Sequence, residues 1–287
     1  MANAGGFKDR LSGRLPYLTK TETKVAEYVL ENYDSEELLK YNVSELAKKA
    51  KVSDATIIRF CRSVGCSGYQ DFKVNLAKDL IPMEKQLHPN VERGDDTRTI
   101  CTKIFTAEIS VLKDTLQELD MQLIDEIAER ILKAEKLLIF GTGGSQVVAL
   151  DALHKFLKVG VRTYVYQDVD LQLMSSSLVG ENDVALCISF SGGNHSIISC
   201  MKNAKNNGAY TVGIISLPKS QLVRQKLLDA VIYSAYDKTI FQSESVSTRI
   251  AQLAIVDCLV SKVAFMDYEK SLASIAMTRR ATTENKM

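Results

Sequence analysis

Five short apolar stretches in the second half of the chain constrain its fold more than any other feature. They are apolar almost throughout rather than in alternation, and stretches with helical periodicity separate them. Continuous apolar strands that alternate with helices are typical of a parallel sheet covered on both faces. The sequence therefore predicts an α/β three-layer sandwich, flavodoxin-like, with a five-stranded parallel sheet. The expected strands are KLLIF (136–140), VRTYVY (161–166), DVALCIS (183–189), AYTVGIIS (209–216) and AVIY (230–233).

Helices are expected between these strands and on either side of them. The first two precede the sheet, and the last is long and apolar. The polar segment from Ala276 is expected to be a loose tail. The expected helical ranges are Thr99 to about Leu119, Met121 to Ala134, 145–158, 169–179, 194–207, 219–228 and about Ser243 to Asp267.

The region before this alternation has a different, all-helical pattern. Residues 44–65 read SELAKKAKVSDATIIRFCRSVG. Ser44 is expected to cap a first helix, Lys51 and Val52 to form a turn, and Ser53 to cap a second helix. Two short amphipathic helices joined by so short a turn predict a helix-turn-helix unit within an all-α N-terminal domain.

The second helix of this unit places polar side chains at three-residue intervals along one face. This is the geometry that a recognition helix needs to reach base edges in a major groove. An amphipathic helical hairpin with exposed arginines can also be purely structural, and the pattern alone leaves both interpretations open. The candidates for base contacts are Thr56, Arg59 and Arg62, and the candidates for phosphate contacts are Lys51, Ser53 and Lys73.

Charge supports a local DNA-binding module on an otherwise neutral protein. The chain has 36 Lys and Arg against 35 Asp and Glu, which argues against coating by nucleic acid. Between Lys40 and Lys78, however, eight basic residues face three acidic ones. An amphipathic helix at 17–33 precedes the unit, and a proline-containing segment follows it. The expected organisation is a helix-turn-helix domain at 1–79, a linker at 80–98, an α/β domain at 99–275 and the polar tail at 276–287.

Two loops at the carboxyl ends of expected strands are rich in glycine and hydroxyl side chains. They are GTGGS (141–145) and SFSGGN (189–194), and each opens a helix. Glycines let a ligand approach the backbone, hydroxyls bind phosphate oxygens, and helix N-termini attract anions. The pair predicts a site for a phosphorylated small molecule, although either loop alone is a weak signal. Gln146 replaces the third glycine of a dinucleotide motif, and no Gly-Lys-Ser/Thr of a P-loop is present.

With these motifs in order, almost the whole chain resembles the RpiR family of bacterial transcriptional regulators. The matching stretches are VSELAKKAKVSDATIIRFCRSVGCSGYQDFKVNLAK, the GTGGS and SFSGG loops, and ESVSTRIAQLAIVDCL. The resemblance implies an N-terminal helix-turn-helix domain and a C-terminal sugar isomerase (SIS) domain that senses a phosphosugar. It implies phosphate contacts from the hydroxyls of Ser145, Ser189 and Ser191 and from the backbone at Thr142, Gly143, Gly192 and Gly193. It also places Glu244 and Ser247 against the sugar or an adjoining subunit.

The sequence departs from the family pattern at Asn194, where the second loop usually has a threonine. An amide can still donate to a phosphate oxygen. The departure argues against transferring the effector of a relative to this chain.

The leading hypothesis is a regulator, not an enzyme, whose operator binding responds to a phosphosugar of a sugar-utilisation pathway. The alternatives are a phosphosugar isomerase with an appended helix-turn-helix domain, and an interaction scaffold. Catalysis would draw on Glu244, His154 or His195, of which His154 is expected to be packed or solvated.

Partners and location follow from the same hypothesis. The apolar last helix, which includes Ile250, Leu253, Ile255 and Leu259, is expected to pair two subunits. A homodimer, with a tetramer as the alternative, would bind a roughly palindromic operator. Scattered cysteines without a CxxC pair predict neither metal nor disulfides, and no cofactor is expected. Without a signal peptide or an apolar run of roughly 20 residues, we expect a cytoplasmic protein that does not enter the membrane.

Overall fold

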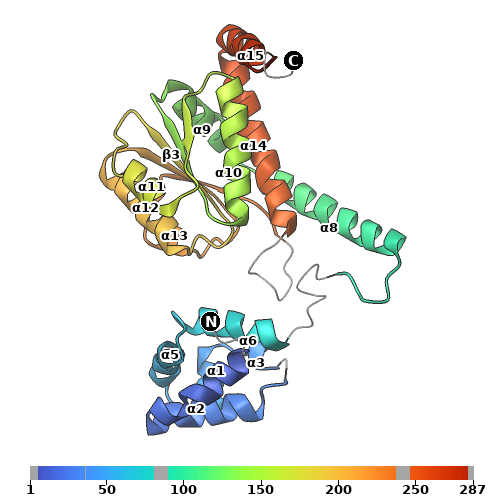
Figure 1. Cartoon of the computed structure of the whole chain (residues 1–287), viewed down its shortest axis with the longest axis vertical. Helices are drawn as coiled ribbons and strands as arrows, with labels where there is room; N and C mark the ends of the chain where they lie inside the picture. The colour runs from blue at the N-terminus through green and yellow to red at the C-terminus, as the bar shows by residue number, and fades with distance from the viewer. Residues whose placement is uncertain (1–5, 36, 81–89, 237–245, 284–287) are drawn as a thin grey trace. The chain divides into compact units, whose positions relative to one another are not determined.

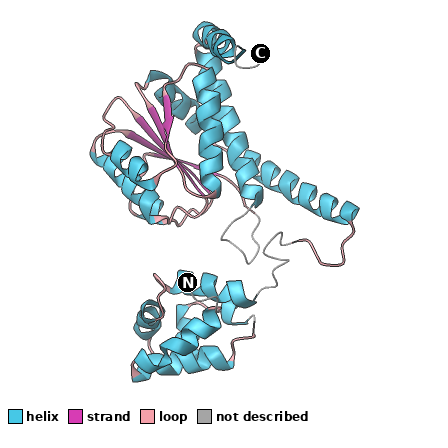
Figure 2. Cartoon of the chain, viewed as in Figure 1, coloured by secondary structure: helices cyan, strands magenta, loops and turns pink. Residues whose placement is uncertain are grey.

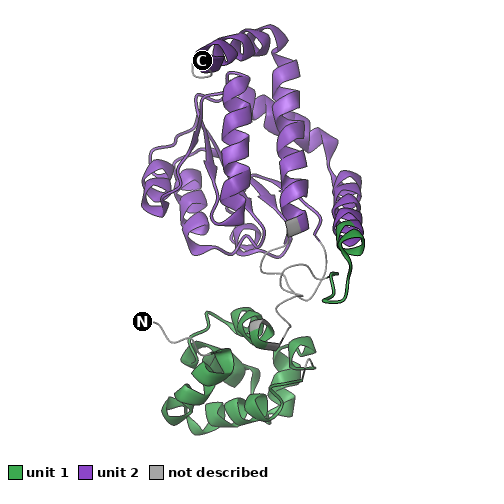
Figure 3. Ribbon diagram, turned by 45° about the vertical axis from the view of Figure 1, so that its right-hand side comes forward, with its two compact units in different colours: residues 1–101, 239–243 green, residues 102–238, 244–287 purple. Residues whose placement is uncertain are grey.

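A computed structural model of the chain describes residues 6–35, 37–80, 90–236 and 246–283. The chain divides into two compact units (Figure 3). The first ends at Cys101, and the described residues from Thr102 onward form the second. None of the helices in these described ranges is both long and apolar enough to cross a membrane.

The first unit is built from short helices around a single apolar core. Phe72 lies at its centre, with Phe7 and Phe60 packed edge-on against it at ring-centroid distances of 5.6 Å. Val29 and Ile57 are fully buried beside them. The elements are α1 (Phe7–Arg14), the 3-10 turn η1 (Leu15–Tyr17), α2 (Lys20–Glu31), α3 (Glu37–Lys40), α4 (Val43–Lys49), α5 (Asp54–Ser63) and α6 (Tyr69–Leu80).

Helices α4 and α5 form the predicted helix-turn-helix unit, with one error at its start. The cap of α4 is Asn42, not Ser44: the Asn42 side chain accepts from the N–H of Glu45 at 2.9 Å, and the Glu45 carboxylate accepts from the N–H of Asn42 at 2.7 Å. This reciprocal pair satisfies two free N–H groups at once, which a lone serine cannot do. The Ser53 cap on α5 is confirmed, since its hydroxyl accepts from the N–H of Thr56.

The second unit contains the predicted five-stranded parallel sheet (Figure 2). The strand order is β2-β1-β3-β4-β5, and every neighbouring pair is parallel. Ile139 of β1 lies opposite Leu186 of β3, which in turn lies opposite Val212 of β4. The strands are β1 (Leu137–Phe140), β2 (Thr163–Val165), β3 (Val184–Ser189), β4 (Tyr210–Ile215) and β5 (Ala230–Tyr233).

Helices cover both faces of this sheet, because alternate residues of each strand face opposite layers. Leu137 and Ile139 pack with α9, α10 and α14 on one face, while Leu138 and Phe140 pack with α11, α12 and α13 on the other (Figure 1). The helices are α8 (Thr97–Glu118), α9 (Met121–Lys133), α10 (Gly144–Lys158), α11 (Val169–Ser176), α12 (His195–Asn206), α13 (Gln221–Arg224), α14 (Val246–Met266) and α15 (Tyr268–Thr283).

Much of the apolar surface of α14 packs within its own subunit. Ile255 and Leu259 are buried in the core beneath α14, and Leu253 packs partly against it. Ile250 is among the few large apolar side chains of α14 that remain exposed. A helix that covers a sheet face needs such a stripe for its own core, so the stripe is accounted for within the subunit, and pairing of two subunits through α14 stays a prediction.

The C-terminal segment also differs from expectation, because α15 continues through Thr283 rather than ending in a loose tail. The hydroxyls of Thr278, Thr282 and Thr283 donate to backbone carbonyls three or four residues earlier, so they are satisfied within the helix. Ala, Met and Arg in this segment favour a helix, and no glycine or proline interrupts it.

Candidate functional site

The sheet places the two glycine-rich loops next to each other. Strands β1 and β3 are hydrogen-bonded neighbours, with Phe140 opposite Cys187. The loop after β1 (141–143) leads into α10, and the loop after β3 (190–194) leads into α12. Carboxyl ends of neighbouring parallel strands form one edge, where ligands of open α/β sheets bind. The two loops therefore lie side by side with their helix N-termini at that edge.

The first loop closes tightly and leaves its helix without a side-chain cap. Gly143, the N-cap residue of α10, has φ 57° and makes no side-chain cap hydrogen bond. A β-carbon on Gly141 would lie 2.9 Å from the carbonyl oxygen of Ser145, so the turn requires glycine there. Thr142 and Ser145 are half-buried, and Gly143 is exposed. The first turn of α10 is thus open to a ligand.

The first loop is held from below by a glutamine that the sequence analysis missed. Gln172 of α11 is 1% exposed, and its amide nitrogen donates to the carbonyls of Gly141 at 3.0 Å and Tyr166 at 2.9 Å. The same nitrogen donates to the side chain of Gln146, whose own amide reaches Tyr166. The residue that breaks the dinucleotide pattern therefore supports the loop. No local motif indicates this contact, since it joins α11 to the end of β1.

The second loop satisfies its own backbone with its side chains. The Ser189 hydroxyl is buried and accepts from the N–H of Gly192 at 3.0 Å, while the exposed Ser191 hydroxyl accepts from the N–H of Gly193 at 3.3 Å. The Asn194 side-chain oxygen caps α12, accepting from two N–H groups at 3.0 and 3.2 Å. Each hydroxyl keeps its proton and Asn194 keeps its NH₂ group, so all three can still donate to an anion.

Helix α14 brings a further residue to the first loop. Arg249 lies against Gly144, because a β-carbon built on Gly144 would be 3.0 Å from the guanidinium carbon of Arg249. Figure 1 shows α14 beside α10, with both helices starting at the same end of the sheet. Ser247, one of the predicted site residues, is buried in the first turn of α14. Glu244 lies outside the described residues. Sequence reasoning missed Arg249 because a single arginine inside a helix gives no signal by itself.

The candidate DNA-reading helix has a different exposed face from the predicted one. Thr56 is only 4% exposed. Its hydroxyl forms a 3.0 Å hydrogen bond with the hydroxyl of Ser53 and accepts a 3.4 Å hydrogen bond from the Arg59 guanidinium. The prediction that Thr56 reads bases is therefore wrong for this conformation, because its side chain faces inward with Ile57. Arg59 and Arg62 are exposed as predicted.

The two lysines predicted to contact phosphates differ in their exposure and hydrogen bonding. Lys51 is exposed at the turn between α4 and α5, with φ 53°. Lys73 is half-buried on α6 and donates to the carbonyl of Tyr41 at 3.3 Å, and burial lowers its pKa. Ser53, at the N-terminus of α5, is exposed. The structure thus leaves Lys51 available and engages Lys73 within the fold.

Comparisons with known proteins agree with this two-part architecture. The helix-turn-helix domain of the rpiR family matches residues 5–82, and the SIS domain matches residues 130–262. HexR, an HTH-type transcriptional regulator of Pseudomonas aeruginosa, is 32% identical over 93% of this chain and 93% of its own. An uncharacterised HTH-type transcriptional regulator of Caldanaerobacter subterraneus subsp. tengcongensis is 31% identical over 94% of each chain.

A solved structure extends the likeness to the whole fold. The Vibrio vulnificus NanR protein complexed with ManNAc-6P has a TM-score of 0.68 and 25% sequence identity, over 97% of this chain and 98% of its own. The chain belongs to the RpiR family of transcriptional regulators. This RpiR-family protein therefore carries a DNA-binding helix-turn-helix domain and a SIS domain, as its sequence resemblance implied.

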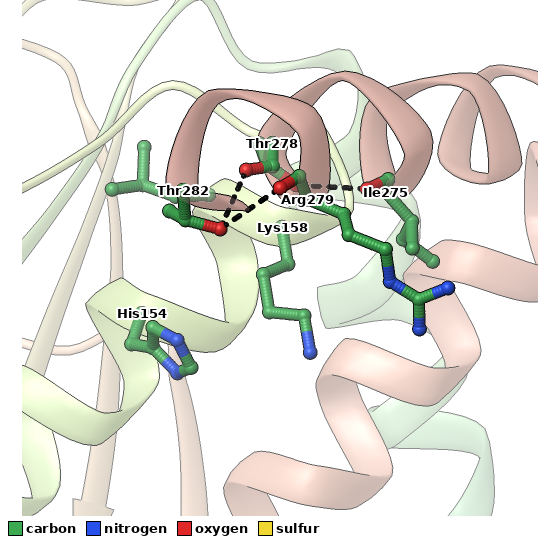
Figure 4. A pocket seen from close by; sticks show the side chains of 7 residues that line it. His154, Lys158, Ile275, Thr278, Arg279 and Thr282 are labelled. Atoms are coloured by element: carbon green, nitrogen blue, oxygen red, sulfur yellow. Dashed lines mark hydrogen bonds between the residues drawn. The ribbon is translucent and has the colours of Figure 1, made fainter. Parts of the chain in front are cut away.

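Two of the three histidines of this RpiR-family protein lie in the described residues, and they occupy two separate places. His195 is the exposed first residue of α12, next to the second loop. His154 instead lines a cavity of about 420 Å³ between α10 and α15, with Lys158 and Arg279 (Figure 4). His154 lies ten residues along α10 from Gly144, or about 15 Å at the rise of an α-helix. It is exposed, as expected for a solvated side chain away from the loops.

Proposed function

We propose that the two loops of the SIS domain bind the phosphate of a phosphosugar effector and that this binding modulates operator recognition. The observation that carries the proposal is the pairing of two Gly/Ser loops at one sheet edge, each opening a helix. Ser145, Ser189, Ser191 and Asn194 supply donors, and Thr142, Gly143, Gly192 and Gly193 supply close backbone approach. Glu244 and Ser247 are proposed to contact the sugar or an adjoining subunit.

Charge favours an anion at this position. Neither 141–150 nor 189–200 contains an aspartate or glutamate, and two helix N-termini point to the same edge. Each N-terminus carries roughly half a positive charge. The ManNAc-6P complex of NanR supports a phosphosugar as the class of ligand, although Asn194 argues against assuming the same sugar.

The DNA contacts are proposed to come from α5 and the turn before it. Arg59 and Arg62 are exposed on one side of α5 and can reach base edges, while Lys51 and the helix N-terminus at Ser53 can bind backbone phosphates. We propose a homodimer on a roughly palindromic operator in the cytoplasm, because a two-fold dimer presents two recognition helices to two half-sites.

We further propose that this protein does not turn its effector over. Aldose–ketose isomerisation needs a general base near the sugar carbons and a donor for ring opening. Among the described residues, His195 is the histidine beside the loops, and the loops themselves carry no acid. Glu244, the other candidate base near the sugar, lies outside the described residues. The relatives of this chain are named as transcriptional regulators, which supports the proposal.

The test is operator binding by the purified protein, titrated with hexose and amino-sugar phosphates. We expect one phosphosugar to alter a sequence-specific mobility shift and to be recovered unchanged. The double variant Ser145→Ala, Ser191→Ala should keep operator binding and lose the response. Ser177→Ala, which removes an exposed hydroxyl bonded to the Met174 carbonyl, is the matched control. A normal response in the double variant would overturn the site, and turnover of the phosphosugar would favour the isomerase alternative.

A further inference from the structure

The positively charged side chain of Arg249 lies at the first loop, in space left open by a glycine. Gly144 is the first residue of α10, and the Arg249 guanidinium occupies the space where a β-carbon of residue 144 would project. Such a β-carbon would lie 3.0 Å from Cζ and 3.2 Å from Nε of Arg249. The absence of a side chain at Gly144 is therefore what lets the guanidinium reach the loop.

Nothing on the described part of the chain neutralises this cation. Arg249 is half-buried, and the described residues offer it neither a hydrogen bond nor an ion pair. It stands in the first turn of α14 and against the first turn of α10, where helix dipoles place positive charge. A cation beside two helix N-termini is electrostatically unfavourable, because all three charges are positive. An anion bound among the guanidinium and the two N-termini is attracted to each of them.

Resting on the proposed function above, we propose that Arg249 binds the effector's phosphate directly, as the contact contributed by α14. A guanidinium offers two parallel N–H donors that match two phosphate oxygens, which hydroxyls on the loops cannot do alone. The phosphate would then join α10, α12 and α14 at one point. Gly144 is the positioning residue, because it keeps the path of the guanidinium open.

The first test measures the binding of inorganic phosphate at pH 8 by calorimetry, so that no effector identity is assumed. Arg249→Met should weaken binding by about tenfold to a hundredfold, the usual range for a charged hydrogen-bond pair. Arg249→Lys should recover part of the lost affinity, since lysine restores the positive charge but not the two parallel N–H donors. Arg162→Met is the matched control, because Arg162 immediately precedes β2 and lies at the amino ends of the strands, away from the two loops.

The second test leaves the arginine in place. Gly144→Ala should weaken phosphate binding in the same direction as Arg249→Met, because the methyl group takes the space of the guanidinium. Alanine is a good helix former, so α10 should remain folded. Gly180→Ala is the control, since Gly180 precedes β3 at the amino ends of the strands and its β-carbon would meet no atom within 4 Å.

Unfolding without phosphate separates a ligand contact from a structural role. Arg249→Met should unfold at the same temperature as the parent or slightly higher, because repulsion at the helix ends is removed. A clear loss of stability without phosphate, or unchanged phosphate affinity, would overturn the proposal for Arg249. If the parent protein binds no phosphate, or if Ser145→Ala, Ser191→Ala binds it as the parent does, the proposed site itself is wrong. If only the serine variant loses binding, the site stands and Arg249 is excluded.

Discussion

The two glycine-rich loops lie side by side but are stabilised in opposite ways. The second loop uses its own Ser189, Ser191 and Asn194 to satisfy its backbone and to cap its helix. The first loop has no side-chain cap and depends on other elements, with Gln172 of α11 below it and Arg249 of α14 against it. The second loop therefore combines its own side-chain hydrogen bonds with backbone hydrogen bonds from Ser216 to Phe190 and from Leu222 to Gly192, whereas the geometry of the first depends on how α11 and α14 pack.

The largest effect should come from breaking the local order of the second loop. Gly192 has φ 56°, and a β-carbon there would lie 2.6 Å from Cβ of Ser220. Gly192→Ala should destabilise the protein by about 1–3 kcal/mol from backbone strain, with more from the clash. Gly143→Ala in the first loop shares the left-handed φ but meets no atom within 4 Å, so its cost should be smaller. Urea unfolding measures the free energy of unfolding of both variants. Equal losses of stability would contradict the expected difference between the two loops.

Removing the support beneath the first loop should have the next largest effect. Gln172→Leu leaves the buried Gly141 carbonyl without its 3.0 Å donor, at an expected cost of about 1–3 kcal/mol. Effector binding should weaken as well, because the loop loses its position. Gln225→Leu changes an exposed glutamine and serves as control. If Gln172→Leu binds phosphate normally, the first loop is as independent as the second.

Asn194 allows capping and ligand binding to be separated in the second loop. Asn194→Ala removes the helix cap and should cost about 0.5–2 kcal/mol. Asn194→Asp keeps the capping oxygen but replaces the NH₂ donor with negative charge. We expect the aspartate variant to unfold like the parent in denaturant titrations and to lose phosphate binding in calorimetry. Retained phosphate binding would remove Asn194 from the site.

The smallest effect concerns the opposite edge of the sheet, at the amino ends of the strands, where the carboxylates of Asp183 and Asp229 lie. Burial alone would raise the pKa of Asp229, but hydrogen bonds from Lys205 and Thr211 outweigh it and lower that pKa below its ordinary value of 3.8. A lowered pKa stabilises the folded state above pH 3.8, and this stability is lost as the pH falls through the folded value.

Asp229→Asn should therefore flatten the loss of stability below about pH 4, by less than about 1 kcal/mol because the pair is partly screened by solvent. Phosphate binding at pH 8 should be unchanged in this variant, because Asp229 precedes β5 and lies at the amino ends of the strands. Reduced binding would show that the two edges are coupled. Acid titration of the unfolding free energy of both proteins provides the measurement.

The sequence predicts what depends on neighbouring residues and misses what depends on packing between distant elements. The strands were predicted to within a few residues, because continuous apolar runs flanked by helices have few other solutions. Thr56 was misplaced because three-residue spacing drifts around a helix of 3.6 residues per turn, so the face that carries Arg59 and Arg62 turns Thr56 inward. Gln172 and Arg249 could not be found, since their partners lie 31 and 105 residues away in the chain.

The close approach of Arg249 to Gly144 also limits the order in which these two positions can change over evolutionary time. A side chain at position 144 takes the space of the guanidinium and obliges the flexible arginine to shift, whereas loss of the arginine leaves an open space that alanine or serine fills. A lineage that exchanges both residues is therefore expected to lose the arginine first. The reverse order passes through an ancestor in which the two side chains compete for one place.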